Sequence, residues 1–171
     1  MRNNRIVVVI AALALAAGVS TAAAGDGEGV VASAGGGYSF SGPVPGGFIE
    51  VHPFAWNVTL HADGGVHGRY QYVQTRDGVE LMVRGSLTCA AIQGNHVWVG
   101  GVIEDSSRET LIGLDMWFQA QDNGEPGSDE TADMSSTIGA GPPGTGQQYC
   151  DQSPPVRFPF LIEQGDLQVR S

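Results

Sequence analysis

The stretch FAWNVTLHADGGVHGRYQY, residues 54–72, decides the fold class. Apolar and polar residues alternate on both sides of the turn formers ADGG, which is typical of two strands that each bury one face. The apolar face carries Phe54, Trp56, Val58 and Leu60 before the turn and Tyr70 and Tyr72 after it. The stretch therefore predicts an antiparallel hairpin.

The turn also predicts a register for this hairpin. A three-residue loop at 63–65 pairs Ala62 with Val66 and keeps the two apolar faces together. The same register places His61 directly opposite His67 on the outward face, at the spacing of about 5 Å that suits two metal ligands. No third ligand is evident, so two solvated imidazoles are the preferred interpretation.

The alternation continues along the chain. It predicts strands at 79–91, 96–105, 111–121 and 134–138, with one or two closing strands in 158–169. A bulge or a close backbone approach is expected at Gly100–Gly101, and Cys89 is placed on the core face. No helix is expected after residue 24, and 139–155 reads as a long Gly- and Pro-rich loop. The prediction is an all-β fold of six to eight strands, either an antiparallel β-sandwich or a small β-barrel.

The N-terminus carries an export signal. Residues 1–24 combine two arginines, a short apolar run and a small-residue end, which is the pattern of a cleaved signal peptide. The prediction for the mature chain is a flexible Gly/Ala-rich lead-in at 25–47, with at most a short strand near 38–40, and one all-β domain at 48–171. No membrane span is expected in the mature chain.

The net charge of the chain narrows the classes of binding partner that can be expected. The formal net charge is −10, and it becomes −12 without the signal because Arg2 and Arg5 leave and no acid does. All eight basic residues are arginine. Such a surface repels nucleic acid and anionic lipid, so neither is an expected partner.

Cys89 and Cys150 are the only cysteines. An even count in an exported chain predicts a disulfide between them. On the chain-entropy model, closing a loop of this length with a disulfide restricts the unfolded chain and stabilises the fold by about 4 kcal/mol.

Four segments resemble a known family: GRYQY at 68–72, SLTCAAIQGNHVWVGGVIEDS at 86–106, FQAQDNGEPGSDE at 118–130 and GDLQV at 165–169. The chain is similar over residues 54–169 to small exported bacterial all-β domains of uncharacterised function. These domains are found alone or as C-terminal modules of surface proteins. The resemblance implies the β fold and an extracellular or cell-envelope setting, and it implies no catalytic residues.

The acidic segment QDNGEPGSDETAD, residues 121–133, raises the question of calcium. Asp122, Glu125, Asp129 and Asp133 supply hard oxygen ligands, but their spacing fits neither an EF-hand nor a repeated calcium motif. The Asn-Gly and Pro-Gly pairs are typical of a solvated reversing loop, which is the preferred interpretation.

Catalytic signals are sparse. Glu104, Asp105 and Asp115 are the only acids expected near a concave face, as a glycosidase needs, and no nucleophile triad or phosphate-binding glycine loop is evident. Trp98, Trp117 and Tyr149 are possible binding groups, and Trp117 shares a predicted outward face with Asp115 and Gln119, as in sugar- or peptide-binding surfaces. A tryptophan partly covered by the Cys150 segment explains that pattern equally well.

These observations predict a non-catalytic, cofactor-free interaction module of the cell envelope or the extracellular space, with an unknown partner. The alternatives are a small-ligand carrier whose apolar pocket is lined by Trp56, Tyr70 and Tyr72, and a hydrolase that uses Glu104, Asp105 or Asp115.

Overall fold

The computed structural model describes residues 29–44, 48–76, 78–124, 132–155 and 160–171. Ten strands form one antiparallel sheet in the order β10-β1-β2-β3-β4-β5-β6-β7-β9, and β8 pairs with β6 off this path. The longer strands are β1 (Val30–Val44), β2 (Phe48–His61), β3 (Val66–Arg76), β4 (Val79–Gln93) and β5 (His96–Ser106). The shorter ones are β6 (Asp115–Gln121), β7 (Met134–Ser135), β8 (Gly139–Gly141), β9 (Phe160–Leu161) and β10 (Gln164–Arg170). A 3₁₀ turn, η1 (Glu109–Leu111), and one helix, α1 (Thr145–Gln152), complete the described elements.

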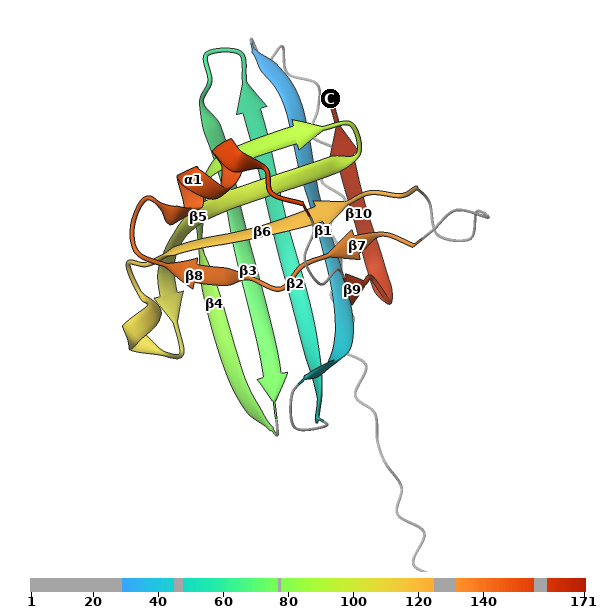
Figure 1. The fold of residues 1–171 in the computed structure, drawn as a ribbon, viewed down its shortest axis with the longest axis vertical. Coiled ribbons are helices and arrows are strands. Elements are labelled where there is room, and N and C mark those ends of the chain that lie inside the picture. The colour runs from blue at the N-terminus through green and yellow to red at the C-terminus, as the bar shows by residue number, and fades with distance from the viewer. Residues whose placement is uncertain (1–28, 45–47, 77, 125–131, 156–159) are drawn as a thin grey trace, which may run out of the picture.

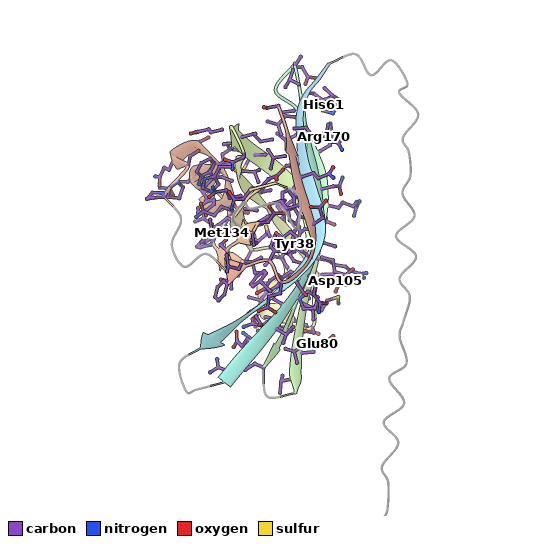
Figure 2. The ribbon with its side chains drawn as sticks, turned by 90° about the vertical axis from the view of Figure 1, so that its right-hand side faces the viewer. Tyr38, His61, Glu80, Asp105, Met134 and Arg170 are labelled. Atoms are coloured by element: carbon purple, nitrogen blue, oxygen red, sulfur yellow. A yellow bond between two sulfur atoms is a disulfide. The ribbon has the colours of Figure 1, made fainter. Side chains whose placement is uncertain are left out.

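The sheet is curled into a half-barrel. β5 to β8 cross in front of β1 to β4, and α1 lies on the outside of this front layer (Figure 1). Seen from the side, Met134 lies in the front layer, Arg170 lies in the back layer, and Tyr38 lies between them (Figure 2). The all-β prediction is confirmed, with more strands than the six to eight expected because β7, β8 and β9 are only two or three residues long.

The bend between the layers lies in the β4–β5 pair. Its register shifts twice, between Arg84 and Gly85 and between Leu87 and Cys89. Such bulges bend a strand and increase its twist. A Cβ atom at Gly100 would lie 2.6 Å from Gly146 O and 2.7 Å from Cys89 Sγ, so the expected bulge and the expected close approach are both present.

The second bulge also changes the side on which Cys89 lies. Cys89 pairs with Gly100, which faces α1, while Ala90 pairs with Val99 in the core. The predicted core-face position of Cys89 is therefore wrong, because the extra residue in β4 reverses the alternation after Leu87.

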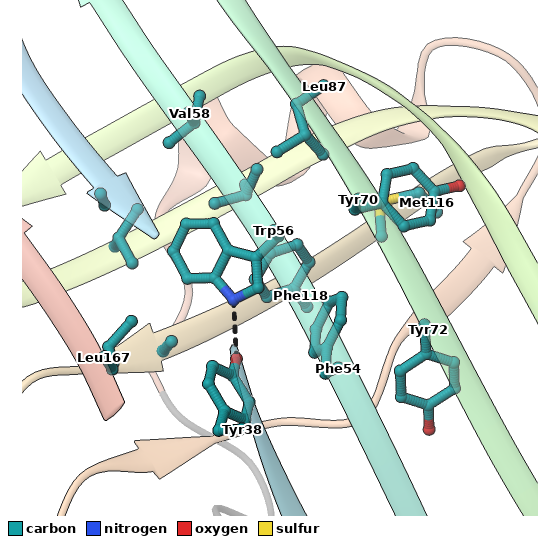
Figure 3. Packing of buried hydrophobic residues seen from close by; sticks show 14 of the residues in the cluster. Tyr38, Phe54, Trp56, Val58, Tyr70, Tyr72, Leu87, Met116, Phe118 and Leu167 are labelled. Carbon is teal, nitrogen blue, oxygen red and sulfur yellow. Dashed lines mark hydrogen bonds between the residues drawn. The ribbon is translucent and has the colours of Figure 1, made fainter. Parts of the chain in front are cut away.

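The core fills the space between the two layers. The Trp56 ring packs edge-on against Phe118, with ring centroids 5.0 Å apart, and Trp56 Nε1 donates a hydrogen bond of 2.8 Å to Tyr38 Oη (Figure 3). Tyr38 Oη in turn lies 2.9 Å from Ser135 Oγ in β7. This chain of bonds joins the back layer to the front layer.

The lead-in prediction is wrong for residues 30–44. This segment is β1, which pairs with β2 on one side and β10 on the other. Glycine is normally depleted in strands, but it is required here by close approach. A Cβ atom at Gly35 would lie 2.7 Å from Trp56 O, and one at Gly36 would collide with Asp166 O.

The hairpin of residues 54–72 forms with a different register from the one predicted. Trp56 pairs with Tyr70 and Leu60 with Val66, which shifts the partners by two residues and leaves the apolar faces together. The loop between the last paired residues is five residues long instead of three, and it is closed by two hydrogen bonds: Gly64 N donates to His61 O, and His61 N donates to Gly65 O.

Candidate functional site

Two of the residues predicted to bind ligand, Trp117 and Gln119, line one pocket of about 350 Å³ on the outer face of β6. The residues that complete its described wall come from the segment after β7, from α1 and from the segment after α1: Ser136, Thr137, Ile138, Gly139, Tyr149, Pro154 and Pro155. The pocket thus combines three stretches that lie up to 38 positions apart in sequence, and the alternation of β6 provides only its floor.

Trp117 is half-buried because β8 runs alongside its ring. A Cβ atom at Gly139 would collide with the indole, and one at Gly141 would lie 3.0 Å from Trp117 Cη2. The glycines of β8 therefore allow the backbone to lie directly against the ring. Tyr149 of α1 provides a second aromatic wall, with its ring centroid 6.0 Å from that of Trp117 and the two planes tilted by 33°.

Gln119 is buried and joins two elements at the base of the pocket. Its Oε1 atom, on β6, lies 3.1 Å from His96 Nε2 on β5. Burial raises the pKa of Tyr149 to about 12, although the nearby Gln119 side chain opposes the rise. The phenol is consequently a neutral hydroxyl at ordinary pH.

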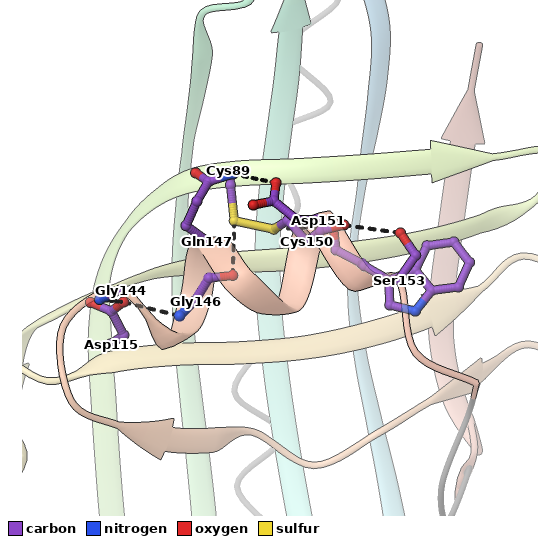
Figure 4. Close-up of a disulfide and its surroundings, with 9 residues drawn as sticks. Cys89, Asp115, Gly144, Gly146, Gln147, Cys150, Asp151 and Ser153 are labelled. Atoms are coloured by element: carbon purple, nitrogen blue, oxygen red, sulfur yellow. Dashed lines mark hydrogen bonds between the residues drawn. A yellow bond between two sulfur atoms is a disulfide. The ribbon is translucent and has the colours of Figure 1, made fainter.

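The outer wall of the pocket is fixed by α1, which the sequence analysis missed. The predicted loop at 139–155 is wrong at Thr145–Gln152, where the chain is helical. The Cys89–Cys150 disulfide, which was predicted, joins α1 to β4 with 6.2 Å between the Cα atoms (Figure 4). The segment after the helix is fixed as well, because Trp98 Nε1 donates a 2.7 Å hydrogen bond to Pro154 O.

Asp115 does not line the pocket. Its Oδ2 atom accepts hydrogen bonds from Gly144 N at 2.7 Å and Gly146 N at 3.0 Å, at the N-terminus of α1 (Figure 4). Gly144 has a φ of 96°, which a glycine adopts without strain. Asp115, which was predicted to bind ligand together with Trp117 and Gln119, caps the helix from a neighbouring strand.

Of the three acids considered for hydrolysis, Glu104 and Asp105 line one groove, each beside an arginine, and Asp115 lies elsewhere. Asp105 forms an exposed ion pair with Arg84, with Oδ2 2.6 Å from Nη2, and Glu104 lies 3.7 Å from Arg69 on the same face. These two pairs line an open groove of about 660 Å³ on the outside of the back layer. Asp115 lies on β6 and is engaged by α1.

The acidic segment is used structurally at both of its ends. Asp122 Oδ2 accepts a 2.8 Å hydrogen bond from Val169 N, and Asp133 Oδ2 accepts one of 3.2 Å from Leu167 N. Asp133 Oδ1 also accepts a bond from Asn123 N at 2.7 Å. Glu125 and Asp129, the other calcium candidates, lie outside the described residues.

His61 and His67 are in contact, although they are not paired directly. His67 pairs with Thr59, and the two imidazoles meet diagonally with ring centroids 5.2 Å apart. Within the described residues there is no group of three or more His, Cys, Asp or Glu side chains arranged to hold a metal ion.

A buried polar network in the back layer was also missed. Tyr72 Oη lies 2.5 Å from His52 Nδ1, and His52 Nε2 lies 3.6 Å from Glu50 Oε2. Gln74 Nε2 donates to Glu50 Oε2, and Glu50 Oε1 lies 3.4 Å from Arg76 Nε. The alternation that starts at Phe54 extends back through His52 to Glu50, so both polar residues fall at inward-facing positions. This pattern could have predicted the network from the sequence.

The residues proposed to line a carrier pocket instead pack against other side chains. Trp56, Tyr70 and Tyr72 are 5%, 4% and 1% exposed. Tyr72 packs edge-on against Phe54, with centroids 5.2 Å apart, as Trp56 does against Phe118. These three rings thus contribute to the core between the layers.

None of the helices in the described part of the chain is long and apolar enough to cross a membrane. Comparisons with models of protein families, with curated proteins and with solved structures found no match to this chain.

Proposed function

We propose that this protein is an exported, non-catalytic interaction module that binds its partner, in the cell envelope or outside the cell, through the Trp117 pocket. The observation that carries the proposal is the joint wall of Trp117 and Tyr149, two half-buried rings contributed by different elements. Aromatic side chains that are held rigidly at a concave site are the usual anchors of recognition.

Other features support the same proposal. The export signal predicted at 1–24, the resemblance to bacterial surface domains and the Cys89–Cys150 disulfide all fit a protein outside the cytoplasm. The non-catalytic part is supported by the partners of the candidate acids, since Asp115 caps α1 and Asp105 is ion-paired with Arg84.

The test is binding of the purified protein to isolated cell envelopes of the producing bacterium. Trp117→Ala removes one aromatic wall, so we expect at least a tenfold loss of affinity, the usual effect of truncating an anchor residue. Trp117→Phe keeps a ring and should retain part of the binding. Val79→Ala, at an exposed position on β4, serves as the control for unspecific effects. Wild-type binding by a folded Trp117→Ala protein would contradict the proposal.

A further inference from the structure

We infer that the Trp117 pocket takes a small uncharged saccharide, of one or two sugar rings. This inference rests on the proposed function, because it assigns a ligand class to the same pocket. It follows from the charge, the size and the polar groups of the pocket.

The first argument is charge. The chain has a formal net charge of −10, yet the described wall of the pocket contains no Asp, Glu, Arg or Lys. The nearest acid on the same face of β6, Asp115, is occupied by the N–H groups of Gly144 and Gly146. A charged ligand would therefore find no ion-pair partner among these residues, whereas a neutral ligand needs none.

The second argument is shape and size. The volume of about 350 Å³ lies near the lower end of the range for small-molecule sites. The Trp117 and Tyr149 rings are tilted by 33°, so they form two adjoining walls rather than one flat platform. A sugar ring presents C–H groups on its faces, and these pack on aromatic carbon, as other apolar groups do.

The third argument is hydrogen bonding. A sugar also presents hydroxyl groups around its edge, and each one loses water on binding and needs a partner. Gln119, Ser136 and Thr137 line the pocket beside its aromatic walls. Ser136 Oγ already accepts from Gln119 N and donates to Thr137 O, and Gln119 Oε1 is paired with His96, so the hydroxyls offered to a sugar are those of Thr137 and Tyr149. Burial raises the pKa of the Tyr149 phenol, so the phenol stays protonated and its O–H can donate to a sugar oxygen.

Two rival ligand classes fit less well. Aromatic pairs also hold quaternary ammonium groups by cation–π attraction. Such a group makes no conventional hydrogen bonds, so the polar groups of the wall would gain no new partner in place of the water that they lose. A proline-rich peptide needs an extended aromatic groove, whereas here the segment at Pro154 and Pro155 closes one side.

The experiment uses the three tryptophans of the chain as reporters. Purified protein labelled with ¹⁵N is titrated with maltose, cellobiose, lactose and N,N′-diacetylchitobiose, and the indole N–H signals are followed by NMR. We expect at least one of these sugars to move the Trp117 signal in a saturable way. The Trp56 signal is the internal control, because its N–H is bonded to Tyr38 in the core.

Variants identify the site. Trp117→Ala, followed through the Tyr149 ring signals, should abolish the saturable shift. Tyr149→Phe keeps the ring and loses the hydroxyl, so the dissociation constant should rise about fivefold, as expected for one lost hydrogen bond between uncharged groups. Gln148→Ala, at an exposed position next to it on α1, should bind as the wild type does.

Choline and tetraproline complete the panel. The inference is overturned if choline or tetraproline moves the Trp117 signal while no sugar does. It is also overturned if the Trp117 signal stays in place with every probe, even at probe concentrations well above millimolar. If Trp117→Ala loses envelope binding and no sugar shifts the Trp117 signal, the proposed function still holds and only the assignment of a saccharide as the ligand is rejected.

Discussion

At the scale of single residues, Asp115 has a structural role, the capping of α1, that its place in the sequence does not suggest. Its position among Trp117 and Gln119 on β6 is typical of a binding face. In the structure it accepts two backbone hydrogen bonds from the N-terminus of α1. Nothing in the local pattern identifies this partner, which lies about 30 positions later in the chain.

Replacing Asp115 should therefore destabilise the protein and distort the pocket wall. We expect Asp115→Ala to lower the free energy of unfolding by about 1–3 kcal/mol, because it leaves two N–H groups without their acceptor. Urea denaturation measures this change. Asp151→Ala removes only an exposed contact with Gln147 on the same helix and should cost less than about 0.5 kcal/mol. Equal losses in the two variants would contradict the assigned capping role.

His52 gives the fold a dependence on pH. Burial lowers its pKa from the ordinary value of 6.5, and the charge of Glu50 opposes this only in part. Below about pH 6.5 the unfolded chain therefore binds a proton that the folded chain does not, and the free energy of unfolding falls as the pH falls. The imidazole faces Glu50 and Tyr72, and Arg76 pairs with the other side of Glu50.

The measurement is the free energy of unfolding between pH 7 and pH 5. His52→Gln should have a shallower slope than the wild type, whatever its absolute stability. Part of the slope should remain, because burial also lowers the pKa of His96. His67→Gln, at an exposed position, provides the matched control. An unchanged slope in His52→Gln would show that His52 does not couple folding to pH.

At the scale of elements, the ends of the acidic segment take the place of a missing strand. Leu167 and Val169 of β10 donate their N–H groups to the carboxylates of Asp133 and Asp122. An edge strand with free N–H groups is a template for unwanted pairing, and these carboxylates block it. At both ends of the acidic segment 121–133, the carboxylates that were considered as calcium ligands thus have a structural role as hydrogen-bond acceptors for β10.

Asp133→Ala should release this edge. We expect a loss of about 1–3 kcal/mol in unfolding free energy, because Asn123 and Leu167 both lose an acceptor. Amide hydrogen exchange at Leu167 should become faster, while exchange in β3 should follow only the global change. Asp166→Ala on β10 itself removes a bond to the Gln168 side chain and should leave Leu167 protected. Faster exchange at Leu167 in this control would contradict the proposed role of Asp133.

The strands that could be predicted are those with local alternation. The hairpin of 54–72, the phase of β6 and the disulfide follow from residue type and spacing. β1 could not be predicted, because its glycines are explained only by the backbones of β2 and β10 on either side. α1 was missed for a related reason: its cap and its disulfide partner belong to other elements.

At the scale of the whole molecule, the two layers have different roles. The back layer of long strands holds the core against the front layer, which is bent over it at the β4–β5 bulges. The front layer carries α1 on its outer face (Figure 1). The Trp117 pocket lies between β6 of this layer and α1. Half of the candidate site could be predicted from β6, and the other half required the tertiary structure that brings Tyr149 to it.

The pairing of β1 with β10 determines how the molecule would respond to tension. Ser33 pairs with Arg170 and Ser39 with Gln164, so the start of β1 and the end of β10 lie at the same corner of the sheet. A force pulling residues 30 and 170 apart would act perpendicular to the strands and break the hydrogen bonds of this ladder one pair at a time. β10 would detach first and would also lose its bonds to the carboxylates of Asp122 and Asp133, while the Cys89–Cys150 disulfide would keep α1 joined to β4.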